Sequence, residues 1–180
     1  MNWKLAAAAL FLAPAMAFAQ GQGPSDPQIA GIVVTANQID IDAGKLAKSH
    51  SKRKDVQDFA QQMITDHSAV NKQAAALAKK LGVKPEDSDT SRSLKQAAAQ
   101  SAKKLKGLKG AQFDRAYVDN EVAYHQQVLD AIDKVLVPGA QNAELKGLIE
   151  KVRPAIQAHL DHAKHVQADL GKRADSGKKK

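Results

Sequence analysis

The sequence predicts an all-α protein that folds as an antiparallel four-helix bundle. Apolar residues recur at helical spacing along most of the chain, and no segment alternates apolar and polar residues as a half-buried strand would. The apolar residues are mainly Ala, Leu, Ile and Val, whereas aromatic residues make up only 4% of the chain. Interiors filled by small aliphatic side chains favour closely packed helices over sheets.

The N-terminal residues have the order of zones that is typical of a secretory signal peptide. Lys4 precedes an apolar stretch from Leu5 to Phe18, and Ala17-Phe18-Ala19 matches a cleavage site. The apolar stretch is too short for a permanent membrane span, and no stop-transfer run follows it. We therefore interpret residues 1–19 as a Sec-type signal peptide cleaved after Ala19, with an uncleaved anchor as the alternative. The mature protein is expected in the periplasm, either free or peripheral to the outer membrane, without a transmembrane segment.

The first half of the mature chain predicts two long helices. The first begins at Asp26, after a Ser25 cap followed by Pro27 and a capping-box Gln28, and runs to about Lys48. The second is expected over residues 52–81, and the following Gly82 ends it.

A long connection, residues 83–110, follows the second helix and contains a short, weakly apolar helix over residues 91–105. This length fits the crossover of a ferritin-like bundle. A simple up-down bundle with the extra helix lying across one end is the alternative.

The second half predicts two further long helices. One runs over residues 112–136 and is stopped by Pro138-Gly139; the other runs over residues 142–171 and is bent by Pro154. The bundle domain is therefore expected to span residues 26–171. Residues 20–25 are expected to be a flexible N-terminus, and residues 172–180 a basic disordered tail.

Composition narrows the classes of function. The chain has no Cys, which excludes disulfides, thiol catalysis and thiolate metal sites. The net charge of +8 attracts anionic partners, but the lysines occur in every segment and the densest cluster, Lys178 to Lys180, is terminal. Aromatic platforms for stacking bases are missing, so we expect no nucleic acid partner. The favoured interpretation is a solvated basic surface, and the alternative is an interaction protein whose basic surface binds acidic lipopolysaccharide or polysaccharide.

Polar residues interrupt the apolar face of every long helix. On a wheel of about 100° per residue, Asp40, His67, Glu121 and His159 fall within these faces, and His125 lies one turn after Glu121. Each lies near the middle of its helix, so an antiparallel bundle brings them to a similar height. Burying one such group alone costs several kcal/mol or forces it neutral. We therefore expect these residues to satisfy one another or to share a ligand.

Two interpretations of this cluster are open. The acids and imidazoles either form a buried hydrogen-bonded network that fixes helix register, or they bind a metal ion. Imidazole and carboxylate ligands suit zinc, copper(II), iron or manganese. In the second case Tyr124 is a candidate for contact with the ligands, and Asp66 either orients His67 or caps the rim of the site. The sequence shows no catalytic triad or phosphate-binding loop, so the default expectation is a non-enzymatic protein.

Three stretches resemble the DUF4142 family of exported bacterial proteins, whose members are often labelled predicted outer-membrane proteins. They are Asp42–Ala47, Phe59–His67 and Phe113–Tyr117, and the resemblance runs from about Asp26 to Val166. It implies a ferritin-like four-helix bundle whose function is unknown.

The family pattern also matches His67, His125 and His159. The first helix of the family usually carries glutamates where this chain has Asp40 and Asp42, each shorter by one methylene. The Glu-x-x-His pairs of di-iron bundles are missing from the sequence, so iron oxidation is the least favoured activity.

Overall fold

The computed structural model describes residues 23–177, and the predicted signal peptide lies outside them. Five long helices make up the described part, in which no strand occurs, so the all-α class is confirmed. No helix in it is both long and apolar enough to cross a membrane. The helices are α1 (Asp26–His50), α2 (Lys54–Leu81), α3 (Asp89–Lys106), α4 (Gly110–Ala131) and α6 (Ala143–Gly177), and the short segments η1 (Ile132–Leu136) and α5 (Val137–Gly139) extend α4.

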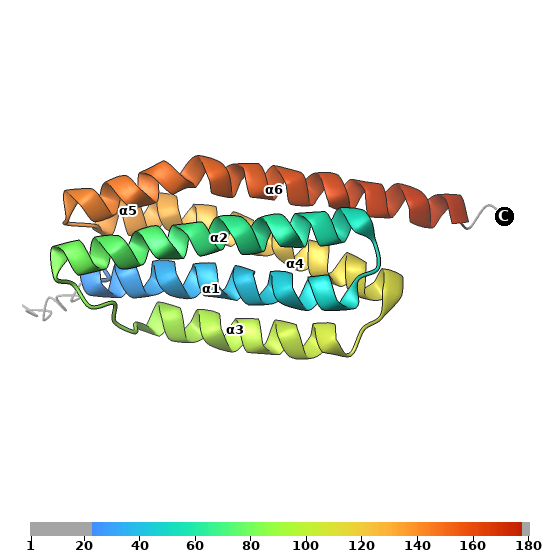
Figure 1. Ribbon diagram of the computed structural model, residues 1–180, viewed down its shortest axis with the longest axis horizontal. Helices are drawn as coiled ribbons and strands as arrows, with labels where there is room; N and C mark the ends of the chain where they lie inside the picture. Colours follow the sequence, from blue (N-terminus) through green and yellow to red (C-terminus); the bar gives the residue numbers. More distant parts are fainter. Residues whose placement is uncertain (1–22, 178–180) are drawn as a thin grey trace, which may run out of the picture.

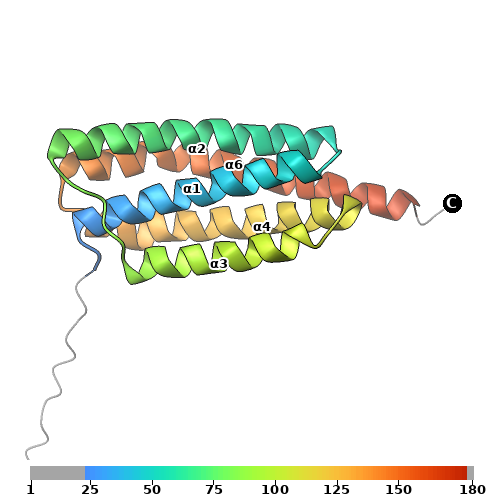
Figure 2. The same ribbon diagram turned by 60° about the horizontal axis from the view of Figure 1, so that its bottom comes forward.

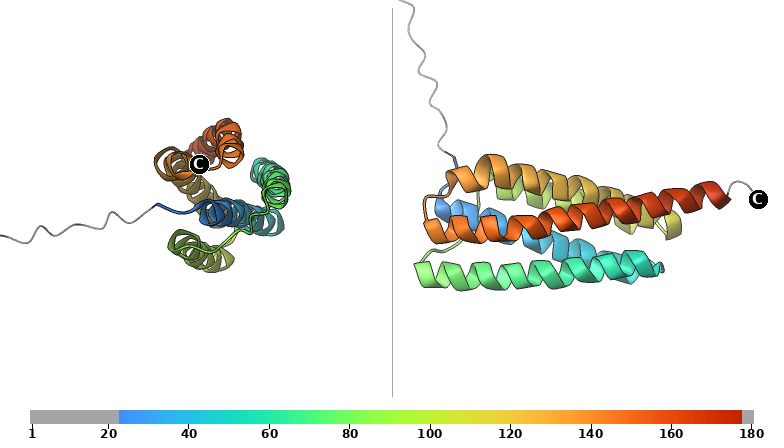
Figure 3. Two further views of the ribbon diagram at one scale, coloured as in Figure 1. Left: turned by 90° about the vertical axis from the view of Figure 1, so that its left-hand side faces the viewer. Right: turned by 90° about the horizontal axis from the view of Figure 1, so that it is seen from above.

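The helices lie along a common axis. α1, α3 and α6 run in one direction, and α2 and α4 run in the other (Figure 1). α1 packs against α2, α3 and α4, while α6 packs against α4 and α2. The end-on view shows α1 near the middle of this arrangement (Figure 3).

α3 is more than the short connecting helix expected from the sequence. It has 18 residues and lies along α1 and α4 instead of across one end of the bundle (Figure 2). The bundle therefore has a fifth long helix, packed on the outside of the other four.

The predicted start of α1 and end of α2 are confirmed. The backbone N–H of Ser25 donates to Oε1 of Gln28 at 3.1 Å, which completes the capping box. Gly82 caps α2 in the left-handed conformation, with φ of 64°, where a side chain would be strained.

The last two helices end later than the sequence predicted. The helix that begins as α4 continues past Leu136 to Gly139 through the π-helical segment η1. Pro138 has no N–H to donate to Lys134, and in η1 the N–H of Val137 reaches back five residues to the carbonyl of Ile132. α6 contains Pro154 and extends beyond Gly171 to Gly177; residues 178–180 lie outside the described part.

Two glycines allow close approach to α1. A Cβ at Gly31 would lie 1.9 Å from the carbonyl oxygen of Glu86, in the connection that follows α2. A Cβ at Gly44 would lie 2.8 Å from the carbonyl oxygen of Ala60 in α2. Any larger residue would push these backbones apart.

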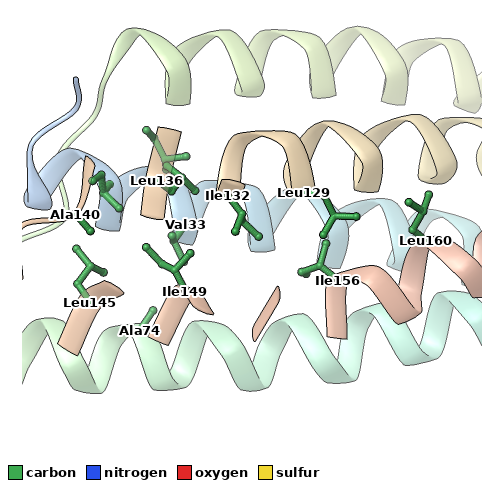
Figure 4. Close-up of a cluster of buried hydrophobic side chains, with 12 residues drawn as sticks. Val33, Ala74, Leu129, Ile132, Leu136, Ala140, Leu145, Ile149, Ile156 and Leu160 are labelled. Carbon is green, nitrogen blue, oxygen red and sulfur yellow. The ribbon is translucent and has the colours of Figure 1, made fainter. Parts of the chain in front are cut away.

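The apolar core consists of two clusters. The first is entirely aliphatic and is built from α1, α2, the α4–α5 helix and α6 near the start of α1 (Figure 4). The second lies toward the other end of the same helices and contains Phe59, Phe113 and Tyr117. On α1, α2 and α4 the sequence-predicted polar residues lie between the two clusters, and on α6 His159 directly precedes Leu160, the last residue of the first cluster, so a polar layer divides the core.

Candidate metal centre

The five candidate residues come together in this polar layer. Asp40 comes from α1, His67 from α2, Glu121 and His125 from α4, and His159 from α6. All five are at most 3% exposed. The expectation that they share one height in the bundle is therefore correct.

The three histidines form the centre of the layer. The ring centroid of His67 lies 5.1 Å from that of His159 and 5.7 Å from that of His125, and the His125 and His159 centroids are 5.5 Å apart. One ring nitrogen from each histidine lies within 4.8 Å of the other two, a spacing that can hold a metal ion.

Each histidine is held by a different acceptor. Nδ1 of His67 lies 2.7 Å from Oδ1 of Asn37, whose own amide nitrogen donates to the carbonyl of Val33. Nδ1 of His125 donates to the backbone carbonyl of Glu121 at 2.9 Å. Because all these partners are acceptors, the bonded nitrogens carry the protons.

His159 also has one nitrogen bonded to an acceptor, but it uses Nε2 where the other two histidines use Nδ1. Nε2 of His159 lies 2.9 Å from Oδ2 of Asp66, a carboxylate that is 43% exposed at the edge of α2. The remaining nitrogens of the three rings, Nε2 of His67, Nε2 of His125 and Nδ1 of His159, are buried and have no hydrogen-bond partner among the described residues. Three unprotonated nitrogens are thus left unbonded in the core.

Two carboxyl groups lie beside these nitrogens. Oδ2 of Asp40 is 3.4 Å from Nε2 of His67. Two ligands that are each about 2.1 Å from a tetrahedral ion lie roughly 3.4 Å from each other. Asp40, Glu121 and His125 also place one ligand atom each within 4.8 Å of one another, and Oδ1 of Asp40 and Oε2 of Glu121 have no partner in the described part of the chain.

Burial controls the protonation of the layer. Burial, together with the neighbouring histidines, lowers the pKa of His67 to about 3 and that of His125 to about 4. Both rings are therefore neutral near pH 7 and keep a lone pair. Burial raises the pKa of Glu121 to about 8, and burial together with the charge of Glu121 raises the pKa of Asp40 well above its ordinary value. Without a cation, the two acids hold at least one proton between them.

The structure differs from the predicted roles of the surrounding residues. Asp66 bonds His159 instead of His67, and Asn37 is the residue that orients His67. The Tyr124 ring stands edge-on to His125 with centroids 6.2 Å apart, but its hydroxyl donates to the carbonyl of Ala36. Asn37 was missed although it lies one helical turn before Asp40, a spacing that indicates the same face.

This arrangement has the chemistry of a metal site. Histidine ligands of metals generally donate their second nitrogen to an oxygen acceptor, which fixes the ring and its tautomer. An unbonded buried polar atom costs on the order of 1–3 kcal/mol, so several close together favour a shared partner. Two overlapping groups, His67/His125/His159 and Asp40/Glu121/His125, could each hold a metal ion.

Comparison with known proteins identifies the family of this chain. The sequence profile described as "Domain of unknown function (DUF4142)" matches residues 12–166. The chain belongs to the DUF4142 family. All five candidate residues of this DUF4142 protein lie inside the matched region. No curated protein matches the sequence.

A crystal structure of a DUF305 protein from Streptomyces coelicolor, a provisionally assigned secreted protein, shares the fold of this DUF4142 chain. The two superpose with a TM-score of 0.66 over 80% of this chain and 92% of the other, at 12% sequence identity. At that identity the likeness concerns the fold alone.

Proposed function

We propose that this protein binds one divalent transition-metal ion in the polar layer of its core. His67, His125 and His159 supply nitrogen ligands, and Asp40 and Glu121 supply oxygen. The observation that carries the proposal is the state of the three imidazoles, each fixed through one nitrogen and unbonded at the other. A structural network would be expected to use both nitrogens of a buried histidine.

The ligand set suits zinc, copper(II), iron(II) or manganese(II), since imidazole and carboxylate together serve all four ions. Binding would also relieve the electrostatic cost of the acids, because a cation favours their ionised form. Asn37 and Asp66 would hold His67 and His159 in place without contacting the ion.

The proposed location is the envelope of a bacterium, in the periplasm or on the inner side of the outer membrane. Residues 1–19 support this through their signal-peptide pattern. We also propose a ferritin-like topology. α2 and α4 run in the same direction, and the connection between them, which contains α3, returns along the bundle as a crossover would (Figure 1).

Elemental analysis of the untagged protein, purified from the periplasm without chelator, tests metal binding. We expect near-stoichiometric zinc, copper, iron or manganese, and its loss in the double variant His67→Leu/His159→Leu. Adding the same ion to metal-free protein is expected to raise the melting temperature of the wild type only.

The matched control is His50→Leu/His165→Leu, which removes two exposed histidines outside the layer. It should keep both the metal and the thermal shift. Wild-type protein that contains no metal, and whose melting temperature none of the four ions changes, would contradict the proposal and leave a structural polar network.

A further inference from the structure

Unpaired positive charge gathers at one end of the bundle. The connection from α1 to α2, the connection from α3 to α4 and the end of α6 all lie at this end (Figures 1 and 2). We call it the basic end and define it by six exposed lysines that form no ion pair with any described residue: Lys48, Lys52, Lys103, Lys104, Lys106 and Lys109.

Acidic residues do not balance this end. Asp55, Asp58 and Asp169 lie at this end, but Arg53, Lys54 and Lys172 already pair with them, and Asp114 is buried. The sequence indicated lysines spread along every segment; the fold instead brings two distant lysine-rich stretches, residues 48–54 and 103–109, to the same end.

The opposite end carries acids among its lysines. There the connection after α2 and the starts of α1, α3 and α6 place five acidic residues together: Asp26, Glu86, Asp87, Asp89 and Glu144. Lys80 and Lys95 pair with Glu144 and Asp87. The positive excess of the chain is therefore polarised along the bundle axis.

Helix stability explains only some of these lysines. Lys48, Lys103, Lys104 and Lys106 lie in the last turns of α1 and α3, where a cation favours the helix dipole. Lys52 lies two residues before the start of α2, and Lys109 is the N-cap of α4, and at a helix start a positive charge opposes the dipole.

The unfavourable placement of Lys52 and Lys109 indicates a role outside the fold. We propose that the basic end docks on an anionic lipid surface through phosphate headgroups. Cationic side chains clustered on one surface are attracted to such a surface within about one Debye length.

Docking would be peripheral and electrostatic. The one exposed large hydrophobic side chain in the described part of the chain is Val135, in η1 at the other end of the bundle. Phe113 and Tyr117, which lie toward the basic end, are buried, and the exposed His50 ring stacks on Phe113, so this end offers no exposed Phe, Tyr or Trp among the described residues for insertion between lipids or stacking on bases. A lipid surface is therefore favoured over nucleic acid.

Co-sedimentation with vesicles tests the proposal on the mature chain. We expect binding to phosphatidylcholine vesicles that contain phosphatidylglycerol, little binding to phosphatidylcholine alone, and a steep loss as salt increases. The variant Lys103→Gln/Lys104→Gln/Lys106→Gln/Lys109→Gln should bind more weakly by up to about several hundredfold, since each of the four lysines contributes roughly fivefold.

The control variant Lys72→Gln/Lys79→Gln/Lys84→Gln/Lys151→Gln has the same net charge and changes exposed, unpaired lysines elsewhere. It should bind within a few-fold of the wild type. Equal loss in both variants would show a nonspecific charge effect and overturn the basic end as the docking site. Failure of the wild type to bind anionic vesicles, or tighter binding to duplex DNA of matched charge, would overturn the lipid surface as its partner.

Discussion

Asn37 fixes His67 although it is not itself a candidate ligand. Its Oδ1 accepts a hydrogen bond from His67 Nδ1 and its Nδ2 donates one to the carbonyl of Val33, so the amide cannot flip without losing both hydrogen bonds. We expect Asn37→Leu to weaken metal binding about 10–100-fold while every ligand remains, because a partner that orients a ligand has an effect of that size. Competition against a chromophoric chelator measures the change.

The neighbouring substitution Gln38→Leu is the control for Asn37→Leu. Gln38 is exposed and its amide donates to Asp42, outside the layer. The metal affinity of the Gln38→Leu variant should match that of the wild type. An Asn37→Leu protein that binds as tightly as Gln38→Leu would show that the orientation of His67 does not depend on this amide.

The two buried acids are expected to lower the stability of the metal-free protein at alkaline pH. Because the folded pKa of Glu121 is raised from an ordinary value near 4.5 to about 8, its stabilisation is complete below pH 4.5 and is lost as the pH rises through 8. His67 and His125 act in the opposite sense. Their lowered pKa values mean that stability is lost as the pH falls from about 6.5 toward 3 and 4.

Metal-free wild type should therefore lose stability as the pH rises from about 6.5 to 8, where the acids still lose protons on unfolding and the histidines no longer compensate for them. Between pH 6.5 and 8, its free energy of unfolding relative to Asp40→Asn/Glu121→Gln should fall by about 1.5 kcal/mol or more. Urea unfolding at several pH values, with chelator present, checks this. A difference that stays constant over the window would mean that neither acid is protonated in the fold.

The sequence predicts the members of the polar layer better than their partners. A helical wheel identifies Asp40, His67 and His159 because it reports which face of a helix a residue occupies. It carries no information on which residue lies opposite on another helix. For that reason Asp66 was assigned to His67, its neighbour in sequence, whereas the structure places it against His159.

At the scale of the helices, Gly44 sets the distance between α1 and α2. An added Cβ would meet the Ala60 carbonyl at 2.8 Å and Ile64 Cγ1 at 2.9 Å. Gly44→Ala should therefore lower the free energy of unfolding by about 1–2 kcal/mol, since overpacking outweighs the helical preference of Ala. Thermal and urea unfolding measure the effect.

Gly147→Ala is the matched control, because it lies inside α6 and a Cβ there would meet nothing within 4 Å. It should raise the free energy of unfolding by about 0.5–1 kcal/mol. Equal effects of the two substitutions would mean that α1 and α2 adjust to the added methyl group at no cost.

Helix boundaries follow the local signals where those signals are strong. Ser25 and Gly82 mark real ends, because a capping box and a left-handed glycine act within one turn. Pro138 was interpreted as a stop, yet the π-helical turn before it lets the helix continue to Gly139. The path of α3 depends on packing against α1 and α4, which its weakly apolar sequence does not specify.

At the scale of the whole molecule, the polar layer has a cost that a metal ion would offset. Replacing the central groups together, in Asp40→Leu/His67→Leu/Glu121→Leu/His159→Leu, removes most of the buried polar atoms of the layer at once, although Asn37 and Asp66 lose their imidazole partners. We expect this variant to stay helical and to match or exceed the metal-free wild type in stability, because apolar replacement of a whole buried network is often neutral or stabilising. It should show no stabilisation by any ion.

Circular dichroism and thermal unfolding, with and without each ion, test this variant. Single His159→Leu is the comparison, since it leaves Asp66 without its imidazole partner. A quadruple variant that fails to fold would mean that the layer specifies the bundle, and the role of the network would then be structural.

The division of the core by this layer also determines which part of the protein contributes to its aromatic near-ultraviolet spectrum. The aliphatic half contains no aromatic ring, whereas Phe59, Phe113 and Tyr117 all belong to the other half. The chain has a single Trp, Trp3, within the predicted signal peptide, so the near-ultraviolet signal of the mature protein would come from its two tyrosines. Those tyrosines report on the layer and on the half nearer the basic end. Fraying of the aliphatic half would be silent in their spectrum and visible only through backbone probes such as amide exchange.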